Sequence, residues 1–237
     1  MATESMALPS SIAATATAAQ PTDWTLPGAV HADAAYLFAK RALDVVAALV
    51  LLVALLPLFA FIALAIWLDS GRPILYRGTR IGRFGRPFSV VKFRSMRADA
   101  DPAAHAAYLR GLMGDAAPCG IYKVPGDPRI TRVGAFLRCT SLDELPQLWN
   151  VLRGEMSLVG PRPDVPYAVA DYADWMRRRL LVTPGITGLW QVSGRSRLSL
   201  IDMYRLDVAY ADGASVLGDI RILLRTIPVV FSRDGAA

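Results

Sequence analysis

Hydrophobic positions form one long uninterrupted run near the start of the chain. Residues 45–68 are 24 consecutive residues without a charge. A straight helix of that length measures about 36 Å, which exceeds the roughly 30 Å of a bilayer core. Pro57 lies in the middle of the run, where a proline removes a backbone donor and bends a helix. The pattern therefore predicts an apolar helix that is bent at Pro57.

Basic residues flank both ends of this helix. Lys40 and Arg41 precede it, and Arg72 and Arg77 begin a basic stretch after it. Because basic residues favour the cytoplasmic side of a membrane, both ends are expected on that side. A re-entrant helix over about residues 44–68 is therefore favoured over a helix that spans the membrane and over one buried in a soluble core.

The segments on either side of this helix differ in composition. Residues 1–38 are rich in Ala, Thr, Ser and Pro without periodicity, which predicts a mobile tail. A signal peptide is not expected, because Glu4 and the lack of an early Lys or Arg remove the basic region that it requires. Residues 39–237 are predicted to form one domain, in which residues at about 72–231 follow the apolar helix.

Alternating hydrophobic positions, separated by Gly and Pro turns, predict strands in residues 73–96. Side chains alternate between the two faces of a strand, so Phe88, Val90, Lys92 and Arg94 share one face. Lys92 and Arg94 could therefore bind a phosphate together. A solvated edge strand explains the same pattern equally well.

Helical patterns dominate the C-terminal half. Residues 98–114 have helical composition, and residues 134–154 are predicted to form one helix. Residues 180–194 are turn-rich, whereas 218–231 predict an amphipathic helix that either lies in a membrane interface or docks on the protein core. The helix at 134–154 carries an apolar stripe with helical spacing: Leu145, Leu148, Trp149 and Leu152.

The charge distribution favours a membrane surface. The net charge of +6 with 54% hydrophobic residues suits nucleic acid, a membrane or an anionic substrate. Between Asp69 and Arg97, however, eight basic residues and one acidic residue give +7 beside the most apolar segment, which indicates anionic headgroups. No nucleic-acid-binding module is recognised, so no nucleic-acid partner is expected. Cys119 and Cys139 lack metal-ligand spacing, so a zinc site is not expected either.

Candidate chemistry is concentrated at Asp143 and Glu144. Ser141 and Glu144 have the spacing of a capping box, and Asp143 would lie in the first helical turn, where the dipole favours a negative charge. Pro146 fits this structural explanation imperfectly. Alternatively, one carboxylate attacks phosphorus while the other holds a divalent cation. A carboxylate is already ionised at neutral pH and needs no base, so both explanations stay open on local grounds.

Arginine side chains could offset the repulsion between a carboxylate and a phosphate. Arg162 lies between two prolines, and such a stiffened loop can present a guanidinium for bidentate phosphate binding. An exposed arginine in a plain turn is the alternative. Residues 183–196 are interpreted as a turn-rich binding loop, in which Trp190 stacks on a base or rests at a membrane interface.

Several motifs, taken in order, resemble the bacterial sugar transferases, the small monotopic phosphoglycosyl transferases that use a polyprenyl phosphate. Each motif is weak alone, whereas the ordered set is specific and covers about residues 40–231. The resemblance is to the compact, exopolysaccharide-initiating type. The motifs are KRALD, Pro57 in the apolar helix, VVKFRSM, GDPRITRVGAFLR, SLDELPQLWNVLRGEMSLVGPRP, TPGITGLWQVSGRS and LDVAYAD.

The resemblance implies an α+β, membrane-embedded fold. A re-entrant helix hairpin would carry a small mixed helical and β catalytic domain with interfacial amphipathic helices, on the cytoplasmic face of the bacterial inner membrane. The implied reaction transfers a sugar 1-phosphate from a UDP-sugar to undecaprenyl phosphate with release of UMP, as the first membrane step of exopolysaccharide or related glycoconjugate synthesis. The alternatives are a membrane-bound glycosyl transferase that releases UDP and a non-catalytic membrane-tethered scaffold.

The resemblance also implies roles for individual residues. Asp143 would be the nucleophile that forms a covalent aspartyl-phosphosugar, and Glu144 would be the Mg²⁺ ligand. Arg138 would bind phosphate near the acid pair, and Arg162 would help to hold the nucleotide sugar. Asp207 matches a further family acid, placed with the substrate-binding residues.

The resemblance leaves other properties open. Some family members have a serine before the helix-breaking proline, whereas Leu56 precedes Pro57 here, so the bend angle does not follow from it. The expected partners are a UDP-sugar, undecaprenyl phosphate and membrane lipids. The sugar is not identified, and the oligomeric state is open, a homodimer included.

Overall fold

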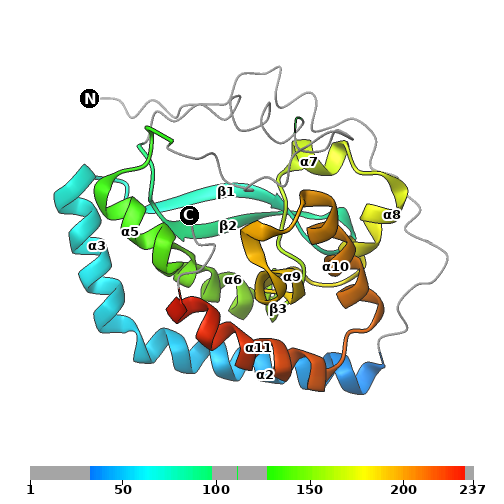
Figure 1. Ribbon diagram of the computed structural model, residues 1–237. Helices are drawn as coiled ribbons and strands as arrows, with labels where there is room; N and C mark the ends of the chain where they lie inside the picture. The colour runs from blue at the N-terminus through cyan, green and yellow to red at the C-terminus, as the bar shows by residue number, and fades with distance from the viewer. Residues whose placement is uncertain (1–32, 98–110, 112–126, 233–237) are drawn as a thin grey trace.

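The computed structural model describes residues 33–97, 111 and 127–232. Most of the predicted tail and nearly all of the predicted helix at 98–114 lie outside these residues. Within them, helices surround short strands (Figure 1), which confirms the α+β class.

The apolar run forms two helices, α2 (Ala34–Ala54) and α3 (Leu56–Ser70), bent by 61°. The predicted bend at Pro57 is confirmed, since Pro57 lies in the first turn of α3, where its missing N–H is not needed. The first helix begins earlier than predicted, at Ala34 within the predicted tail, and the Asp33 side chain caps it. Among the described residues, no individual helix has the length and apolarity to cross a bilayer, whereas α2 and α3 together satisfy both criteria.

The predicted strands form an antiparallel hairpin. Strand β1 (Leu75–Ile81) pairs with β2 (Pro87–Phe93) across the 3-10 turn η1 (Arg83–Gly85). Asn150 covers the other edge of β2, because its amide oxygen accepts from Val91 N at 3.0 Å and its nitrogen donates to Ser89 O at 2.8 Å. The side chain thus satisfies backbone groups that a third strand would otherwise pair.

The single helix predicted at 134–154 is wrong. The chain forms α5 (Arg132–Thr140), a 3-10 helix η2 (Leu142–Gln147) and α6 (Leu148–Arg153). Pro146 explains the interruption, because its ring clashes with the carbonyl four residues earlier and it has no N–H to donate. A 3-10 helix tolerates the proline over a short stretch.

Two further expectations for this segment are corrected. Ser141 adopts a left-handed conformation (φ 59°) and its side chain makes no capping bond, so the capping box is absent at this position. The apolar stripe holds only in part: Leu148 and Leu152 pack in the core, but Trp149 is 54% exposed while Gln147 and Asn150 are buried. With the helix broken at Ser141 and η2, spacing counted along one continuous helix no longer identifies the buried face.

Residues 180–194 are more regular than predicted. Strand β3 (Ser157–Val159) pairs in parallel with β4 (Gly185–Thr187), and α9 (Leu189–Ser193) follows. A Cβ at Gly185 would collide with the backbone at Gly160. The glycine is therefore needed for close approach of two chain segments, and this part of the predicted binding loop is a core element.

Shorter helices complete the C-terminal half. Helix α10 (Leu200–Asp212) contributes Leu200 and Tyr204 to a core that also holds Val165 and Met176. The elements are α7 (Pro166–Ala170), α8 (Asp174–Arg177), η3 (Arg178–Leu181), η4 (Arg195–Arg197), α10 (Leu200–Asp212) and α11 (Val216–Ser232).

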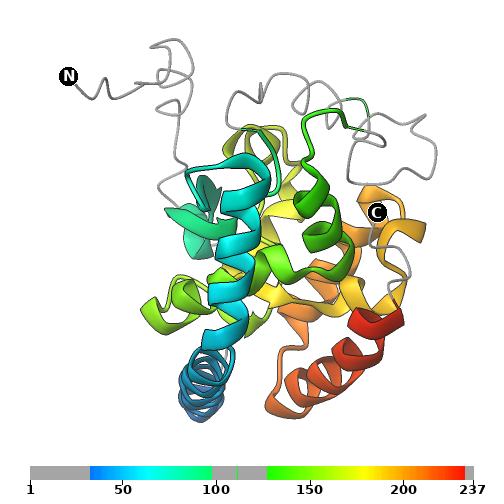
Figure 2. The ribbon, with the colours of Figure 1, turned by 90° about the vertical axis from the view of Figure 1, so that its left-hand side faces the viewer.

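Helix α11 packs beside α2 along one side of the molecule (Figures 1 and 2). It buries Ile222 in the core that also contains Val151 and Leu158. The helix therefore docks on the protein core, which is one of the two placements predicted from the sequence. Its opposite face is apolar and exposed. The exposed residues are Leu217 at 67%, Ile220 at 41%, Leu224 at 63% and Ile227 at 56%.

Charged side chains of α2 attach this helix to the rest of the protein. Lys40 Nζ lies 2.8 Å from Asp219 of α11 and donates to Val159 O at 2.8 Å. Arg41 donates to Val151 O at 2.6 Å and to Leu152 O at 2.8 Å, the last carbonyls of α6. These two basic residues, read from the sequence as membrane-flanking charges, therefore bind groups inside the protein.

Candidate active site

The acid pair lies where the hairpin meets η2. Asp143 and Glu144 occupy the first turn of η2, which packs against β2. The left-handed residue Ser141 reverses the chain after α5, so that the end of α5 and the start of η2 stay close. Arg138 in the last turn of α5 is thereby held near Asp143, and the charges of Asp143 and Asp127 oppose the lowering of the Arg138 pKa by burial.

Glu144 is held by two cations from different elements. Lys92 Nζ of β2 donates to Glu144 Oε1 at 2.7 Å. Arg162 donates in bidentate fashion, with 3.0 Å from Nη1 to Oε2 and 2.5 Å from Nη2 to Oε1. Burial alone would raise the pKa of Glu144, but the charges of Arg162 and Lys92 hold it well below its usual value. Glu144 is therefore ionised at neutral pH.

Asp143 faces the same group of cations. It is 9% exposed, and its charge acts on both Lys92 and Arg138. Burial lowers the pKa of Lys92, against the opposing charges of Glu144 and Asp143. The structure thus brings together four residues that the sequence singled out, Asp143 and Glu144 with Lys92 and Arg138, and Arg162 joins them through Glu144. Such a cluster suits a phosphorylated, anionic ligand.

Arg94 is separated from this cluster. Its Nη2 donates to Ser70 O at 2.7 Å, to Ser70 Oγ at 2.8 Å and to Gly71 O at 2.8 Å. These acceptors form the C-terminus of α3, where a cation is favourable. The structure therefore does not bring Lys92 and Arg94 to one phosphate site: Lys92 faces the acid pair and Arg94 anchors α3 to the hairpin.

Backbone bonds fix the loop that carries Arg162. Gly160 N donates to Thr187 O and Gly185 N donates to Pro161 O, both at 2.9 Å. On the other side of Arg162, Ile81 N of β1 donates to Asp164 O at 2.9 Å. The loop is thus attached to β4 before Arg162 and to β1 after it, and prolines on both sides restrict its backbone further.

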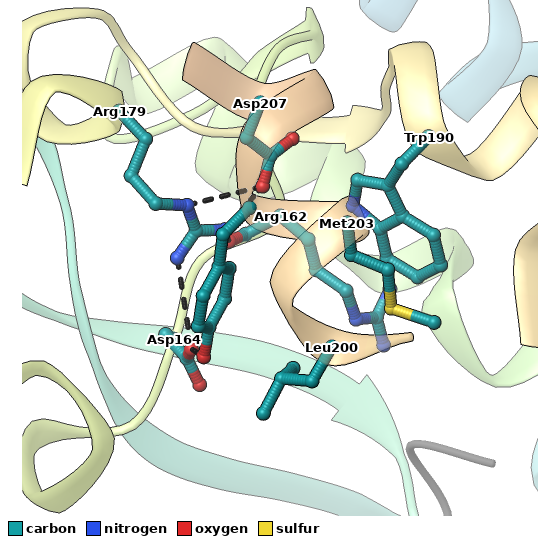
Figure 3. Close-up of a pocket in the computed structure, with 8 residues that line it drawn as sticks. Arg162, Asp164, Arg179, Trp190, Leu200, Met203 and Asp207 are labelled. Atoms are coloured by element: carbon teal, nitrogen blue, oxygen red, sulfur yellow. Dashed lines mark hydrogen bonds and ion pairs between the residues drawn. The ribbon is translucent and has the colours of Figure 1, made fainter. Parts of the chain in front are cut away.

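Asp207 does not lie at the acid pair; it is connected to the loop of Arg162 through Arg179. It is 1% exposed, and its Oδ2 accepts from Arg179 Nη2 at 2.6 Å and from Nε at 3.0 Å. Figure 3 shows Arg179 between Asp207 and Asp164. The hydroxyls of Tyr172 and Tyr204 donate to Asp164 Oδ2 at 2.9 and 2.6 Å.

Most of this buried network is not evident from the sequence. Arg179 is the last of three consecutive arginines that look like a solvated run. Asp164 directly follows the Pro-Arg-Pro segment, and a carboxylate beside a candidate phosphate-binding arginine was a usable signal.

A small cavity of about 10 Å³ borders the network, which is room for about one water molecule. Trp190 lines it and is 9% exposed, so this side chain belongs to the interior beside Arg162 (Figure 3). Among the described residues, Asp207 Oδ1 has no hydrogen-bond partner.

Arg179 therefore pairs with two buried carboxylates, those of Asp164 and Asp207. For Asp164, burial is opposed by Arg179 and by the tyrosine hydroxyls, and its pKa lies below the usual value. For Asp207, burial dominates and raises the pKa to about 6. Asp207 is consequently the member of the network that takes up a proton first.

This difference predicts a pH effect on stability. Between pH 7 and pH 5 the folded protein binds a proton at Asp207 that the unfolded chain does not, so this group adds about 1 kcal/mol of stability as the pH falls. As the pH falls from 7 to 5, the thermal midpoint of wild type should rise relative to that of Asp207→Asn. A midpoint difference that does not change with pH would contradict it.

The carboxylates of the acid pair are of the residue type that binds magnesium. Mg²⁺ is usually held by one or two carboxylates together with substrate phosphates, and Asp143 and Glu144 supply adjacent carboxylates. In the described residues no group of three or more metal-binding side chains is present. Glu144 Oε1 accepts from both Lys92 and Arg162, whereas Oε2 accepts from Arg162 alone, so Oε2 retains a lone pair with which it could bind a metal ion.

Comparison with known proteins points to one family. The family model described as bacterial sugar transferase matches residues 35–233. The UDP-galactose-lipid carrier transferase of Erwinia amylovora is 45% identical over 84% of this chain and 42% of its own length. The UDP-glucose:undecaprenyl-phosphate glucose-1-phosphate transferase of Caulobacter vibrioides is 42% identical over 83% of this chain and 71% of its own.

A compact relative is also similar. The exopolysaccharide production protein ExoY of Rhizobium meliloti is 40% identical over 84% of this chain and 88% of its own length. The chain thus spans less than half the length of the Erwinia relative and most of the length of ExoY.

Proposed function

Since the chain belongs to the bacterial sugar transferase family, we propose that it transfers a sugar 1-phosphate from a UDP-sugar to undecaprenyl phosphate and releases UMP. The observation that carries this proposal is the grouping of Asp143 with Glu144, Lys92, Arg138 and Arg162. An acid pair among three cations is suited to a reaction between a carboxylate and a pyrophosphate. The relatives' names differ in their sugar, so the donor is proposed only as a UDP-sugar.

In the proposed first step, a carboxylate oxygen of Asp143 attacks the sugar-bearing phosphorus of the donor. The bond from that phosphorus to the bridging oxygen breaks, and UMP leaves with the bridging oxygen and its electron pair. Asp143 then carries the sugar phosphate as an acyl phosphate. The guanidinium of Arg162 and the ammonium of Lys92, which bind Glu144 in the structure, would neutralise charge on the phosphate oxygens.

In the proposed second step, a phosphate oxygen of undecaprenyl phosphate attacks the same phosphorus. The bond to Asp143 breaks, which regenerates the carboxylate and forms the lipid-linked sugar diphosphate. Two displacements at one phosphorus allow the water-soluble donor and the lipid acceptor to use the same catalytic group in turn. This would make the reaction the first membrane step of exopolysaccharide or related glycoconjugate synthesis.

Magnesium is proposed as the cofactor, with Glu144 as the residue that would hold it. When bound, it would neutralise charge on the pyrophosphate and so favour attack by an anion. The bonds from Lys92 and Arg162 hold the Glu144 carboxylate in place beside Asp143. The same two cations provide positive charge for the donor phosphates.

The proposed location is the cytoplasmic face of the bacterial inner membrane. The bent pair α2–α3 would enter and leave the bilayer on one side, and the exposed apolar face of α11 would lie in the interface beside it. Trp67 and Phe61 of α3 are 53% and 70% exposed, which suits contact with lipid. This arrangement would bring the acid pair near the phosphate of a lipid acceptor.

The leaving nucleotide distinguishes the proposed reaction from its rivals. Purified protein with a panel of UDP-sugars, undecaprenyl phosphate and Mg²⁺ should release UMP in equal amount to the lipid-linked sugar diphosphate. A glycosyl transferase that moves sugar without phosphate would release UDP, and a scaffold would release neither nucleotide. UDP as the sole product, or no turnover with any donor of the panel, would refute the proposal.

A further inference from the structure

We propose that Arg179 is a positioning residue for the donor phosphate: it holds the backbone of Arg162 so that the Arg162 guanidinium is directed at the donor. This inference rests on the proposed function, in which Arg162 contacts a nucleoside diphosphate. Arg179 is 3% exposed and lies in η3, so it would act through Arg162 rather than on the substrate.

The first support is the set of contacts that Arg179 makes. Its Nη2 donates to the carbonyl oxygen of Arg162 at 2.6 Å and to Asp207 Oδ2 at 2.6 Å. Its Nη1 lies 3.6 Å from Asp164 Oδ2 and donates to the Tyr172 hydroxyl. A planar guanidinium can bond in these several directions at once, whereas a lysine ammonium cannot reproduce that pattern.

The second support is the placement of Arg162 between fixed points. Its carbonyl is bound by Arg179, the preceding residue Pro161 accepts from Gly185 N, and Asp164 accepts from Ile81 N. The Arg162 side chain extends from this held backbone past Trp190 (Figure 3), and its tip reaches Glu144. The guanidinium can therefore exchange Glu144 for a phosphate while its backbone stays in place.

The third support is energetic. Burying one arginine with two carboxylates costs desolvation, and a well-packed apolar replacement is often as stable or more stable. A fold therefore does not need such a network for stability alone. Arg179 of this network binds the carbonyl oxygen of Arg162, which connects the buried charges to a residue of the candidate active site.

The chain offers a matched control for Arg179. The preceding residue, Arg178, lies in the same 3-10 helix but pairs with Asp212 at 2.8 Å, with 37% and 38% of the two side chains exposed. R178Q and R179Q thus make the same chemical change at neighbouring positions. They differ in the burial of the lost guanidinium and in whether it binds Arg162.

The test measures binding of UDP with Mg²⁺ to the full chain in detergent, for wild type, R178Q, R179Q, R162A and the double variant R162A/R179Q. R179Q should weaken UDP binding about tenfold, equivalent to about 1.4 kcal/mol, and R178Q less than twofold. R162A should also weaken binding. The double variant should bind no more weakly than R162A alone, because Arg179 acts through Arg162.

Additive losses in the double variant, or unchanged binding in R179Q, would overturn the proposal. Should R179Q fold poorly, R179K supplies a second variant, expected to keep its thermal midpoint better and still bind UDP more weakly than wild type. If wild type itself binds no UDP, the proposed donor is wrong. Hydrogen exchange then decides on the positioning role. The amides of Ile81 and Gly185, which donate to the loop on either side of Arg162, should exchange faster in R179Q than in R178Q, and equal rates would overturn the proposal.

Discussion

Asp143→Asn should reduce UMP release by roughly 10⁴-fold or more, the scale seen when a catalytic nucleophile is removed. Asparagine keeps the shape of the side chain, but its amide is neutral and cannot form the proposed bond to phosphorus. Incubation of wild type with labelled UDP-sugar alone should leave a sugar-phosphate adduct on the protein, and the variant should carry none. The measurement is nucleotide release together with intact-protein mass.

The control for this variant is Asp174→Asn. Asp174 is fully exposed on α8, so this change should leave nucleotide release within about twofold, as is usual for surface substitutions away from special features. An active Asp143→Asn protein, or an adduct mapped to another residue, would exclude Asp143 as the nucleophile. An inactive variant with a normal thermal midpoint would separate loss of chemistry from loss of fold.

Lys40→Met should destabilise the protein by about 3–5 kcal/mol, because it leaves a buried carboxylate without its cation. Asp219 is 1% exposed, and Lys40 is its ion-pair partner at 2.8 Å. The same carboxylate accepts from the Tyr210 hydroxyl at 2.7 Å, which cannot replace a full positive charge. Thermal unfolding in detergent should show a midpoint lower by roughly 10 °C, since 1 kcal/mol corresponds to about 2–4 °C at this size.

A second substitution distinguishes charge from packing. Lys40→Met combined with Asp219→Asn removes both charges and should recover much of the lost stability. Arg205→Met, which breaks an exposed pair with Asp202, should change the midpoint little. A double variant as unstable as Lys40→Met alone would show that the loss comes from packing around α2.

Much of the candidate site followed from the sequence because local pattern and motif order were sufficient. The 24-residue apolar run with its central proline predicted the bent pair, and period-two alternation with Gly and Pro turns predicted the strands that form the hairpin. The acid pair and Arg162 were chosen from motifs, and the structure joins them directly through Glu144. The proposed chemistry of Asp143 and the magnesium ion stay predictions.

Other features could not be predicted because they depend on long-range contacts. Period alone placed Lys92 and Arg94 together, yet the C-terminus of α3 binds Arg94. The three arginines before Leu180 look alike in sequence, and only the packing of α10 against η3 makes Arg179 a buried partner of Asp207. Pro146 fits a continuous helix poorly, and the sequence shows this. Spacing could not show, however, that the left-handed residue Ser141 and the 3-10 helix η2 would interrupt the predicted helix.

The two bonds from Arg41 to the end of α6 have a mechanical consequence. Helix α6 follows η2 without a break, so Arg41 joins α2 to the short element that begins with the acid pair. If α2 lies in a bilayer as proposed, its tilt fixes the height of the carboxylates above the lipid phosphates. Bilayer thickness would then become a variable of the reaction, because lipids with longer or shorter chains would raise or lower the reactive oxygen relative to its acceptor.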